Sequence, residues 1–367
     1  MNESIQNKLQ ARLYNWFMRK TTPSAVRRVG ELPVMIGSDI GNVRGENQDR
    51  VAVLKVSLDR NQSFVVVALC DGMGGMVEGS ACASQAIASF FAFCVRRRDV
   101  PLQTRLVMAA HEANRAVHAL YQGRGGATLS ALLLDGLGNT FGINIGDSRI
   151  YSYRENKLEQ LTVDDTMAGL LNRGENDVHS SNELIQFIGM GDGVEPHAIL
   201  MPSANELMML TSDGAHFIDK GVMQMVVQNA KEPAMAVKRI IEVAKWCGGR
   251  DNATVAIASP LVFQPQLFDD TGLIQVWDPF GELQVFAVDK YDDQRAENMH
   301  PWEKKSAVQK AADGIAHLPK LIKKKRPTKK KATDKVVPKI DDTDTALERP
   351  QLKIYFNANT DKGGNHA

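Results

Sequence analysis

The sequence lacks the features of a zinc-binding, secreted or membrane-spanning protein. Its four cysteines stand at positions 70, 82, 94 and 247, and none forms a CxxC or Cys/His spacing of the zinc type. Their apolar neighbours indicate buried thiols in a reducing compartment. No apolar run approaches the roughly 20 residues of a membrane span, and the amino terminus lacks the apolar core of a secretory signal. These absences predict a soluble, cytoplasmic protein with no transmembrane segment.

The chain also lacks an excess of charge of either sign. Its 44 basic and 43 acidic residues give a formal net charge of +1. The chain as a whole therefore shows no preference for nucleic acid or an acidic surface, and any such preference must be local. The hydrophobic content of 43% is enough to build a sizeable core. With 367 residues, we expect a globular protein of one large domain or two ordinary ones.

The stretch LCDGMGGMVEG, residues 69–79, places a carboxylate at the end of a predicted strand. The apolar run 64–69 is typical of a buried strand, and Asp71 follows it. Glycines such as Gly72 allow a backbone carbonyl to approach a ligand closely. The pattern suits a hard divalent cation, but glycine-rich turns after strands also bind phosphate. This stretch alone leaves both interpretations open.

Other carboxylates lie where a predicted strand meets a turn, namely Asp49, Asp213 and Asp251. Strand ends of one sheet system can converge although they are distant in sequence. Carboxylates in one cleft would repel one another unless cations lay between them. An oxygen-rich site of this kind favours magnesium or manganese over zinc or copper. The acidic residue of the GDS turn, Asp147, has the same position, and a simple tight turn is the alternative for it.

Arg44 lies in the turn GNVRGENQDR, beside Asp49. Its planar guanidinium can grip a phosphate with two hydrogen bonds. An ordinary surface arginine is the alternative when the residue is viewed alone.

Apolar periodicity predicts strands and helices along the whole chain. The strands with the strongest signal are expected at 34–39, 51–56, 64–69 and 206–211. Helices are expected at 78–98, from Pro101 to about Leu120, at 215–229 and at 233–247. Short turns between the strands of ATLSALLL, TFGINI and RIYSYR favour an antiparallel meander over βαβ units.

Composition divides the chain into four segments. Residues 1–30 predict a helical extension, which either packs on its own domain or docks elsewhere. Residues 31–260 form the main domain, in which 162–197 predict a mobile flap over a binding site. Residues 261–300 contain LIQVW, DPFG and ELQVFAV, which predict a β-hairpin that continues a sheet or recruits a partner. Residues 301–367 predict a disordered tail.

The tail carries the basic run LIKKKRPTKKK. Such a run binds nucleic acid, anionic lipid or an acidic protein by charge alone. No aromatic residues interleave with it, which favours a solvated tail.

Six motifs in order resemble those of metal-dependent serine/threonine protein phosphatases of the protein phosphatase 2C type, in their shorter bacterial style. They are GNVRGENQDR, CDGMGG, GGATLSALLL, INIGDSRIY, LTSDG and RDNATV, within about residues 34–259. The resemblance implies an α+β fold, a four-layer α/β/β/α sandwich with two central antiparallel sheets. It also implies two Mn²⁺ or Mg²⁺ ions, and a weaker third, in a cleft at one end of the sheets.

The resemblance assigns a role to each acidic residue. Asp71 resembles the carboxylate that bridges two metals, and the carbonyl of Gly72 resembles a ligand of one of them. Asp213 and Asp251 resemble the ligands of the other metal. Asp49 resembles a residue that holds metal-bound waters.

Two further residues match the pattern of the family. Asp147, together with Asp213, matches the site of the third metal, and Arg44 aligns with the arginine that binds the substrate phosphate. The resemblance implies that a hydroxide held by two metals attacks phosphoserine or phosphothreonine in a protein directly. The partners implied are a phosphorylated protein substrate and an opposing serine/threonine kinase.

Two positions depart from the family pattern. Gln48 stands where most members have glutamate, which removes one negative charge beside the metals. Met73 stands where many eukaryotic members have a histidine that donates a proton to the leaving group. His216 is one substitute donor, and a histidine of no catalytic use at the start of a helix is the alternative.

Two other functions remain open. The first is a catalytically weak scaffold with the phosphatase fold that binds phosphorylated partners, and Gln48 is the feature in its favour. The second is a nucleic-acid binder that uses its tail, and the neutral overall charge argues against it.

Overall fold

The computed structural model describes residues 3–57, 63–73, 76, 78–135, 139–170, 183–200, 206–259 and 273–286. The chain divides into two compact units, Met1–Leu318 and Pro319–Ala367. All described residues belong to the first unit, so the predicted basic tail lies outside them. Among the described residues, no helix has both the length and the apolar character needed to cross a bilayer.

Within this part of the chain, the strands form two antiparallel sheets. The six-stranded sheet has the order β1 (Ser24–Arg28), β2 (Val34–Asp39), β11 (Ala253–Ala258), β10 (Leu207–Thr211), β7 (Arg149–Arg154) and β8 (Lys157–Gln160). The seven-stranded sheet has the order β13 (Gly281–Phe286), β12 (Leu273–Asp278), β3 (Arg50–Ser57), β4 (Phe64–Cys70), β5 (Leu129–Asp135), β6 (Thr140–Ile145) and β9 (His197–Leu200).

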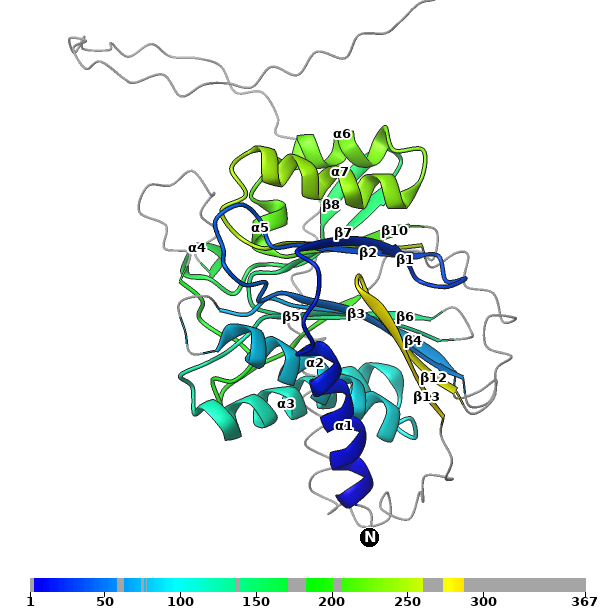
Figure 1. Ribbon diagram of the computed structural model, residues 1–367, viewed down its shortest axis with the longest axis vertical. Helices are drawn as coiled ribbons and strands as arrows, with labels where there is room; N and C mark the ends of the chain where they lie inside the picture. The colour runs from blue at the N-terminus through cyan, green and yellow to red at the C-terminus, as the bar shows by residue number, and fades with distance from the viewer. Residues whose placement is uncertain are drawn as a thin grey trace, which may run out of the picture. The chain divides into compact units, whose positions relative to one another are not determined.

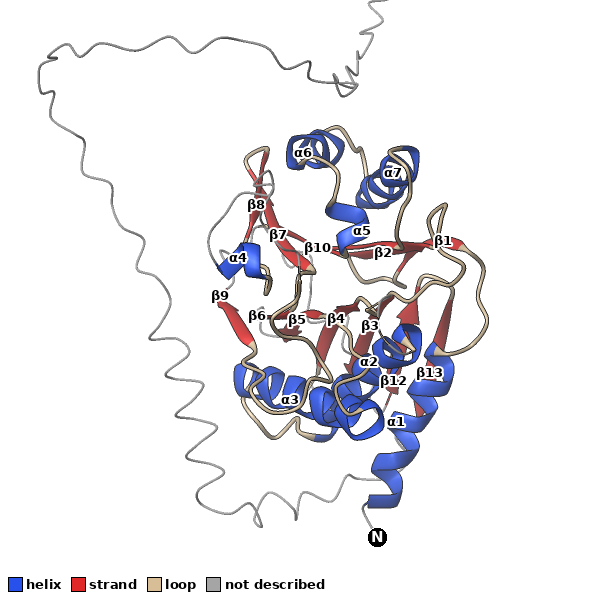
Figure 2. Cartoon of the chain, turned by 90° about the vertical axis from the view of Figure 1, so that its left-hand side faces the viewer, coloured by secondary structure: helices blue, strands red, loops and turns tan. Residues whose placement is uncertain are grey.

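Helices cover the outer face of each sheet (Figures 1 and 2). The seven-stranded sheet is covered by α1 (Glu3–Phe17), α2 (Gly79–Arg96) and α3 (Leu102–Tyr121). The six-stranded sheet is covered by α5 (Asp213–His216), α6 (Lys220–Gln228) and α7 (Pro233–Trp246). A short helix, α4 (Met167–Leu170), lies in the predicted flap. The predicted four-layer α+β sandwich is confirmed.

The strand sequences explain the layers, because alternate residues of one strand enter different cores. In β4, Val65 and Val67 pack between the two sheets, whereas Phe64 and Val66 pack against α2 and its neighbours. Both faces of this strand are buried, so its sequence is continuously apolar rather than alternating. A third core, which includes Met209, lies between the six-stranded sheet and α7.

The strands β12 and β13 form a hairpin that continues the seven-stranded sheet. Its first strand, β12, pairs with β3 over Leu273–Trp277, and β13 pairs with β12. Arg19, just after α1, donates a hydrogen bond from Nη2 to Asp278 Oδ1 over 2.7 Å. The amino-terminal helix and the hairpin are therefore joined by an ion pair.

Three local predictions differ from the structure. The single helix expected at 215–229 is two helices, because Asp219 begins α6 by accepting hydrogen bonds from the N–H groups of Gly221 and Val222. The strand β1 lies inside the segment 1–30, where the sequence predicts only a helix. Cys247 is exposed, unlike the other three cysteines, because it lies at the C-terminal end of α7.

Candidate metal centre

The register of the six-stranded sheet brings three of the predicted aspartates to one end. Thr211, the last residue of β10, pairs with Val255 of β11. Asp213 follows Thr211 and Asp251 precedes Val255, so both lie at this end. The first residue of β7 also pairs with Thr211, which brings Asp147 from the preceding turn to the same place.

The seven-stranded sheet supplies the remaining two aspartates in the same way. Arg50 at the start of β3 pairs with Cys70 at the end of β4. Asp49 therefore lies opposite Asp71, and Gly72 follows directly. A Cβ on Gly72 would lie 2.3 Å from the carbonyl oxygen of Gly79, so no other residue fits this turn without displacement of the backbone.

Electrostatic coupling links aspartates from both sheets. Burial raises the pKa of Asp71 well above its usual value, and the charges of Asp49, Asp213 and Asp147 raise it further. A side-chain hydrogen bond between Asp71 and Asp213 raises the pKa of Asp71 as well. The pKa of Asp213 is also raised, first by burial and then by the charge of Asp251. The five predicted aspartates thus form one acidic cluster, which consists of Asp49, Asp71, Asp147, Asp213 and Asp251.

Two members of the acidic cluster have a pKa of about 7. Burial is the main cause for Asp147, and the charge of Asp213 adds to it. Burial is also the main cause for Asp49, which is 3% exposed. The nearby hydroxyls of Thr254 and Ser212 oppose this rise in the pKa of Asp49. Neither hydroxyl has the geometry of a hydrogen bond, and both carboxylate oxygens of Asp49 are without a hydrogen-bond partner in the described part of the chain.

These observations fit a divalent cation. A buried carboxylate without a partner is costly, and a nearby cation removes that cost. The donor set consists of carboxylate oxygens and the Gly72 carbonyl, which suits Mg²⁺ or Mn²⁺. Among the described residues, no three acidic, histidine or cysteine side chains are close enough to hold an ion by themselves. Magnesium commonly retains several waters beside one or two carboxylates, so an open site of this kind is compatible with it.

Arg44 lies at the edge of the acidic cluster. Its Nη2 is 2.6 Å from Oδ2 of Asp251, and both side chains are partly exposed, 38% and 31% respectively. The charges of Asp251, Asp213 and Asp71 all favour the charged form of the guanidinium. The structure therefore brings Arg44 to the predicted metal ligands and leaves it accessible to a phosphate.

Polar residues that were not singled out in the sequence hold the acidic turns in place. The hydroxyl of Thr128 accepts the backbone N–H of Asp71 over 2.9 Å and contacts Ser148 Oγ over 2.7 Å. The Asn252 side chain accepts the N–H of Gln48 over 2.7 Å. It also donates to the carbonyls of Ile40 and Glu46, over 2.9 and 3.0 Å. Thr128, Ser148 and Asn252 each lie inside one of the six motifs, and that position is the sequence signal that could have identified them.

The flap is connected to the turn that carries Asp147. Asp165 accepts the N–H of Gly146 over 2.7 Å and the amide N–H of Gln186 over 2.7 Å. Its other oxygen is 2.8 Å from Nε2 of His197. Part of the predicted flap, residues 171–182, lies outside the described residues.

His216 is poorly suited to donate a proton. It is 7% exposed, and its Nδ1 lies 2.9 Å from the hydroxyl of Thr211. Burial lowers its pKa well below the usual value, and the charge of Arg149 adds to this. The ring is therefore neutral near pH 7 and serves the packing of α5.

No family model matches the chain. The serine/threonine protein phosphatase PstP of Mycobacterium tuberculosis is 31% identical over 236 residues, which cover 60% of this chain and 43% of the relative. The serine/threonine phosphatase stp of Listeria welshimeri is 26% identical over 251 residues, 62% of this chain and 95% of the relative. The chain thus spans less than half the length of the mycobacterial relative.

The solved structures agree with the curated relatives. The catalytic domain of PstP in complex with two manganese ions is 30% identical, with a TM-score of 0.50, and the match covers 64% of this chain and 97% of that domain. A crystal structure of the M. tuberculosis phosphatase PstP/Ppp is 29% identical, with a TM-score of 0.51. The fold and the acidic cluster are those of a metal-dependent phosphatase. Within it, this chain belongs to the bacterial PPM family of serine/threonine protein phosphatases.

Proposed function

We propose that this chain hydrolyses phosphoserine and phosphothreonine in proteins with the help of two Mn²⁺ or Mg²⁺ ions. The observation that carries the proposal is the acidic cluster at one end of the sandwich, with Arg44 at its edge. Two manganese ions in the related PstP domain support the choice of metal.

Each residue has a role in this proposal. The carboxylates of Asp71, Asp213 and Asp251 and the carbonyl of Gly72 would hold the two metals. Asp49, buried and without a hydrogen-bond partner in the described part of the chain, would hold waters of the metal shell. A weaker third ion would lie at Asp147 with Asp213.

In the proposed reaction, Arg44 orients the phosphate. When bound, the cations would lower the pKa of a water and neutralise the phosphoryl oxygens. Arg44 would hold two phosphoryl oxygens and keep the phosphorus in line with the water and the leaving oxygen. The water oxygen bonds to phosphorus and loses one proton to solvent, the bond to the seryl or threonyl oxygen breaks, and that leaving oxygen takes a proton from solvent water. His216 takes no part.

The reaction opposes that of a serine/threonine kinase, because its substrate is the product of such a kinase. We include an opposing kinase in the proposal for this reason. The scaffold alternative rests on Gln48 alone, whose side chain lies beside Gly79 and whose N–H donates to Asn252.

Hydrolysis of a phosphothreonine peptide tests the proposal. The wild-type chain is assayed with Mn²⁺ and with a chelator, beside Asp71→Asn and the control Asp278→Asn, which lies in the hairpin. Wild type and the control should turn over only with metal, and Asp71→Asn should be inactive. Equal rates for metal-loaded wild type and Asp71→Asn would overturn the proposal.

A further inference from the structure

The loop that carries Arg44 is docked on the end of α7. The side-chain amide of Asn42 donates hydrogen bonds to the carbonyl of Lys245 over 2.8 Å and to that of Gly248 over 3.2 Å. The backbone N–H of Asn42 donates to the carbonyl of Gly249 over 2.7 Å. Asn42 thus ties the loop to the last turn of α7 and to the two glycines that follow the helix.

A buried carboxylate at the base of this loop has both oxygens occupied. Asp39, the last residue of β2, is 1% exposed. Its Oδ1 accepts the N–H of Gly41 over 2.7 Å, which turns the chain away from the strand. Its Oδ2 accepts Nζ of Lys245 over 3.0 Å, which ties the same turn to α7. Burial and full pairing make this a strong local constraint.

The position of this turn affects Arg44 directly, because the loop lies tightly against the turn of Asp251. Gly41 has a φ of +80°, and a Cβ there would lie 2.3 Å from the backbone oxygen of Asp251. Three residues later, Arg44 contacts the carboxylate of the same Asp251 over 2.6 Å. A shift of the turn would therefore move the guanidinium relative to the metal ligands.

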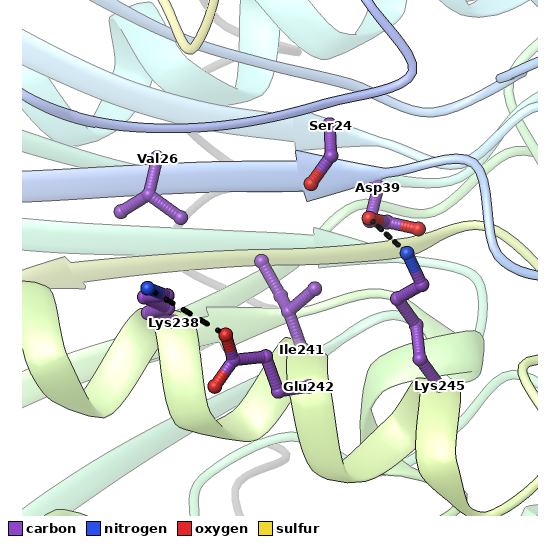
Figure 3. Close-up of a pocket in the computed structure, with 7 residues that line it drawn as sticks. All are labelled: Ser24, Val26, Asp39, Lys238, Ile241, Glu242 and Lys245. Atoms are coloured by element: carbon purple, nitrogen blue, oxygen red, sulfur yellow. Dashed lines mark hydrogen bonds and ion pairs between the residues drawn. The ribbon is translucent and has the colours of Figure 1, made fainter.

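The pair Asp39–Lys245 borders a cavity of about 390 Å³ between β1 and α7 (Figure 3). Ser24 and Val26 of β1 line one side of it. A second pair in the same cavity, Lys238–Glu242, is 3.7 Å long and has both side chains mostly exposed, 66% and 59%. This second pair lies on the same helix, makes no contact with the loop among the interactions described, and provides a matched control.

We propose that Lys245 and Asp39 are positioning residues for phosphate binding, which act by fixing the loop that presents Arg44. Neither residue lies among the metal ligands, and Lys245 acts through Asp39. The inference rests on the proposed function of Arg44 in binding phosphate.

Kinetics of the full chain with Mn²⁺ test the inference. In Lys245→Met, the KM for a phosphothreonine peptide and the inhibition constant of inorganic phosphate should both rise about fivefold, with kcat changed by less than about twofold. Lys245→Arg should restore both constants, and Lys238→Met should match wild type. Unchanged constants in Lys245→Met would overturn the proposal.

A double-mutant cycle separates positioning from general damage. In an Arg44→Ala background, Lys245→Met should cause no further rise in the inhibition constant of phosphate, because the group that it positions is absent. The same rise in both backgrounds would show that Lys245 acts independently of Arg44 and would contradict the inference.

Amide hydrogen exchange provides a readout that needs no activity. The N–H groups of Gly41 and Asn42 should exchange at least about tenfold faster in Lys245→Met than in wild type or Lys238→Met. Unchanged exchange would overturn the positioning role even if the protein hydrolysed no phosphopeptide. An inactive wild type with faster exchange would instead contradict the proposed function and leave the loop contact intact.

Discussion

Asp49 and Asp278 are both buried carboxylates, 3% and 6% exposed, but their surroundings differ. Asp278, in the hairpin, accepts hydrogen bonds from Arg19 and from the N–H of Phe280, over 2.7 and 2.8 Å. Asp49, in the acidic cluster, has no hydrogen-bond partner among the described residues, and burial raises its pKa to about 7.

The partners of a buried carboxylate distinguish a structural role from a role in a functional site. A buried charge with matched partners joins two elements of the fold, here α1 and the hairpin. A buried carboxylate without partners destabilises the metal-free fold, and a bound cation would remove that destabilisation. Burial alone therefore does not identify a site, and the partners of the buried charge do.

The largest expected effect comes from Asp71→Asn. With Mn²⁺, hydrolysis of a phosphothreonine peptide should fall by about a thousandfold or more. In a chelator, the same variant should unfold at a higher temperature than wild type, because the raised pKa of Asp71 means that its ionised form opposes folding. Calorimetric melting measures this. A lower melting temperature in the chelator would contradict the contrast with Asp278.

Arg44→Ala tests the Arg44–Asp251 ion pair, which is partly exposed. Activity should fall by about a hundredfold, because Arg44 orients the phosphate in the proposed reaction. Stability should change by no more than about 0.5 kcal/mol, since the Arg44–Asp251 pair is partly exposed. Phosphopeptide kinetics and urea unfolding measure the two quantities, and Arg44→Lys serves as the control that retains charge. Full activity in Arg44→Ala would remove Arg44 from the site.

Arg19→Met tests the structural role of Asp278, the paired carboxylate. It leaves the buried Asp278 with one hydrogen bond fewer and should lower the free energy of unfolding by about 2 kcal/mol. Arg19 also lies over the ring of Trp16, 3.9 Å from its centroid, so part of the loss comes from that contact. Activity per folded molecule should stay unchanged. A large loss of activity in a fully folded variant would show that the hairpin contributes to catalysis.

The sequence was most informative about strands and acidic turns. The strand at 34–39 has the predicted bounds, and 51–56 and 64–69 extend by one or two residues at most. These strands are buried on both faces, and β4 is accordingly apolar along its whole length. The position of Asp71, Asp213 and Asp251 at strand ends was also evident, because each follows or precedes such a run.

Other features depend on contacts that no local pattern contains. Asp39 ends the strand predicted at 34–39 and Asp165 lies in the predicted flap. Their roles arise from Lys245 and His197, which are distant in sequence. The strand β1 escaped prediction because its side chains are half-buried or exposed along its whole length. Long-range pairing, rather than propensity, decides these cases.

The smallest expected effect concerns His197. Its hydrogen bond to Asp165 raises its pKa above the usual value. A raised pKa in the folded state adds stability below about pH 6.5, and that contribution is lost as the pH rises through the folded pKa. Wild type should exceed His197→Gln in stability at about pH 5.5, and the two should converge by about pH 8.5. Urea unfolding checks this, and a gap that widens with pH would contradict it.

Titration calorimetry with Mn²⁺ is the most direct test of the acidic cluster as a metal centre. Wild type and Asp278→Asn should bind about two ions per chain. Asp71→Asn should lose most of this binding, because the carboxylate that we propose as a ligand of the metals is gone. Absence of binding to wild type, or equal binding to wild type and Asp71→Asn, would contradict the account.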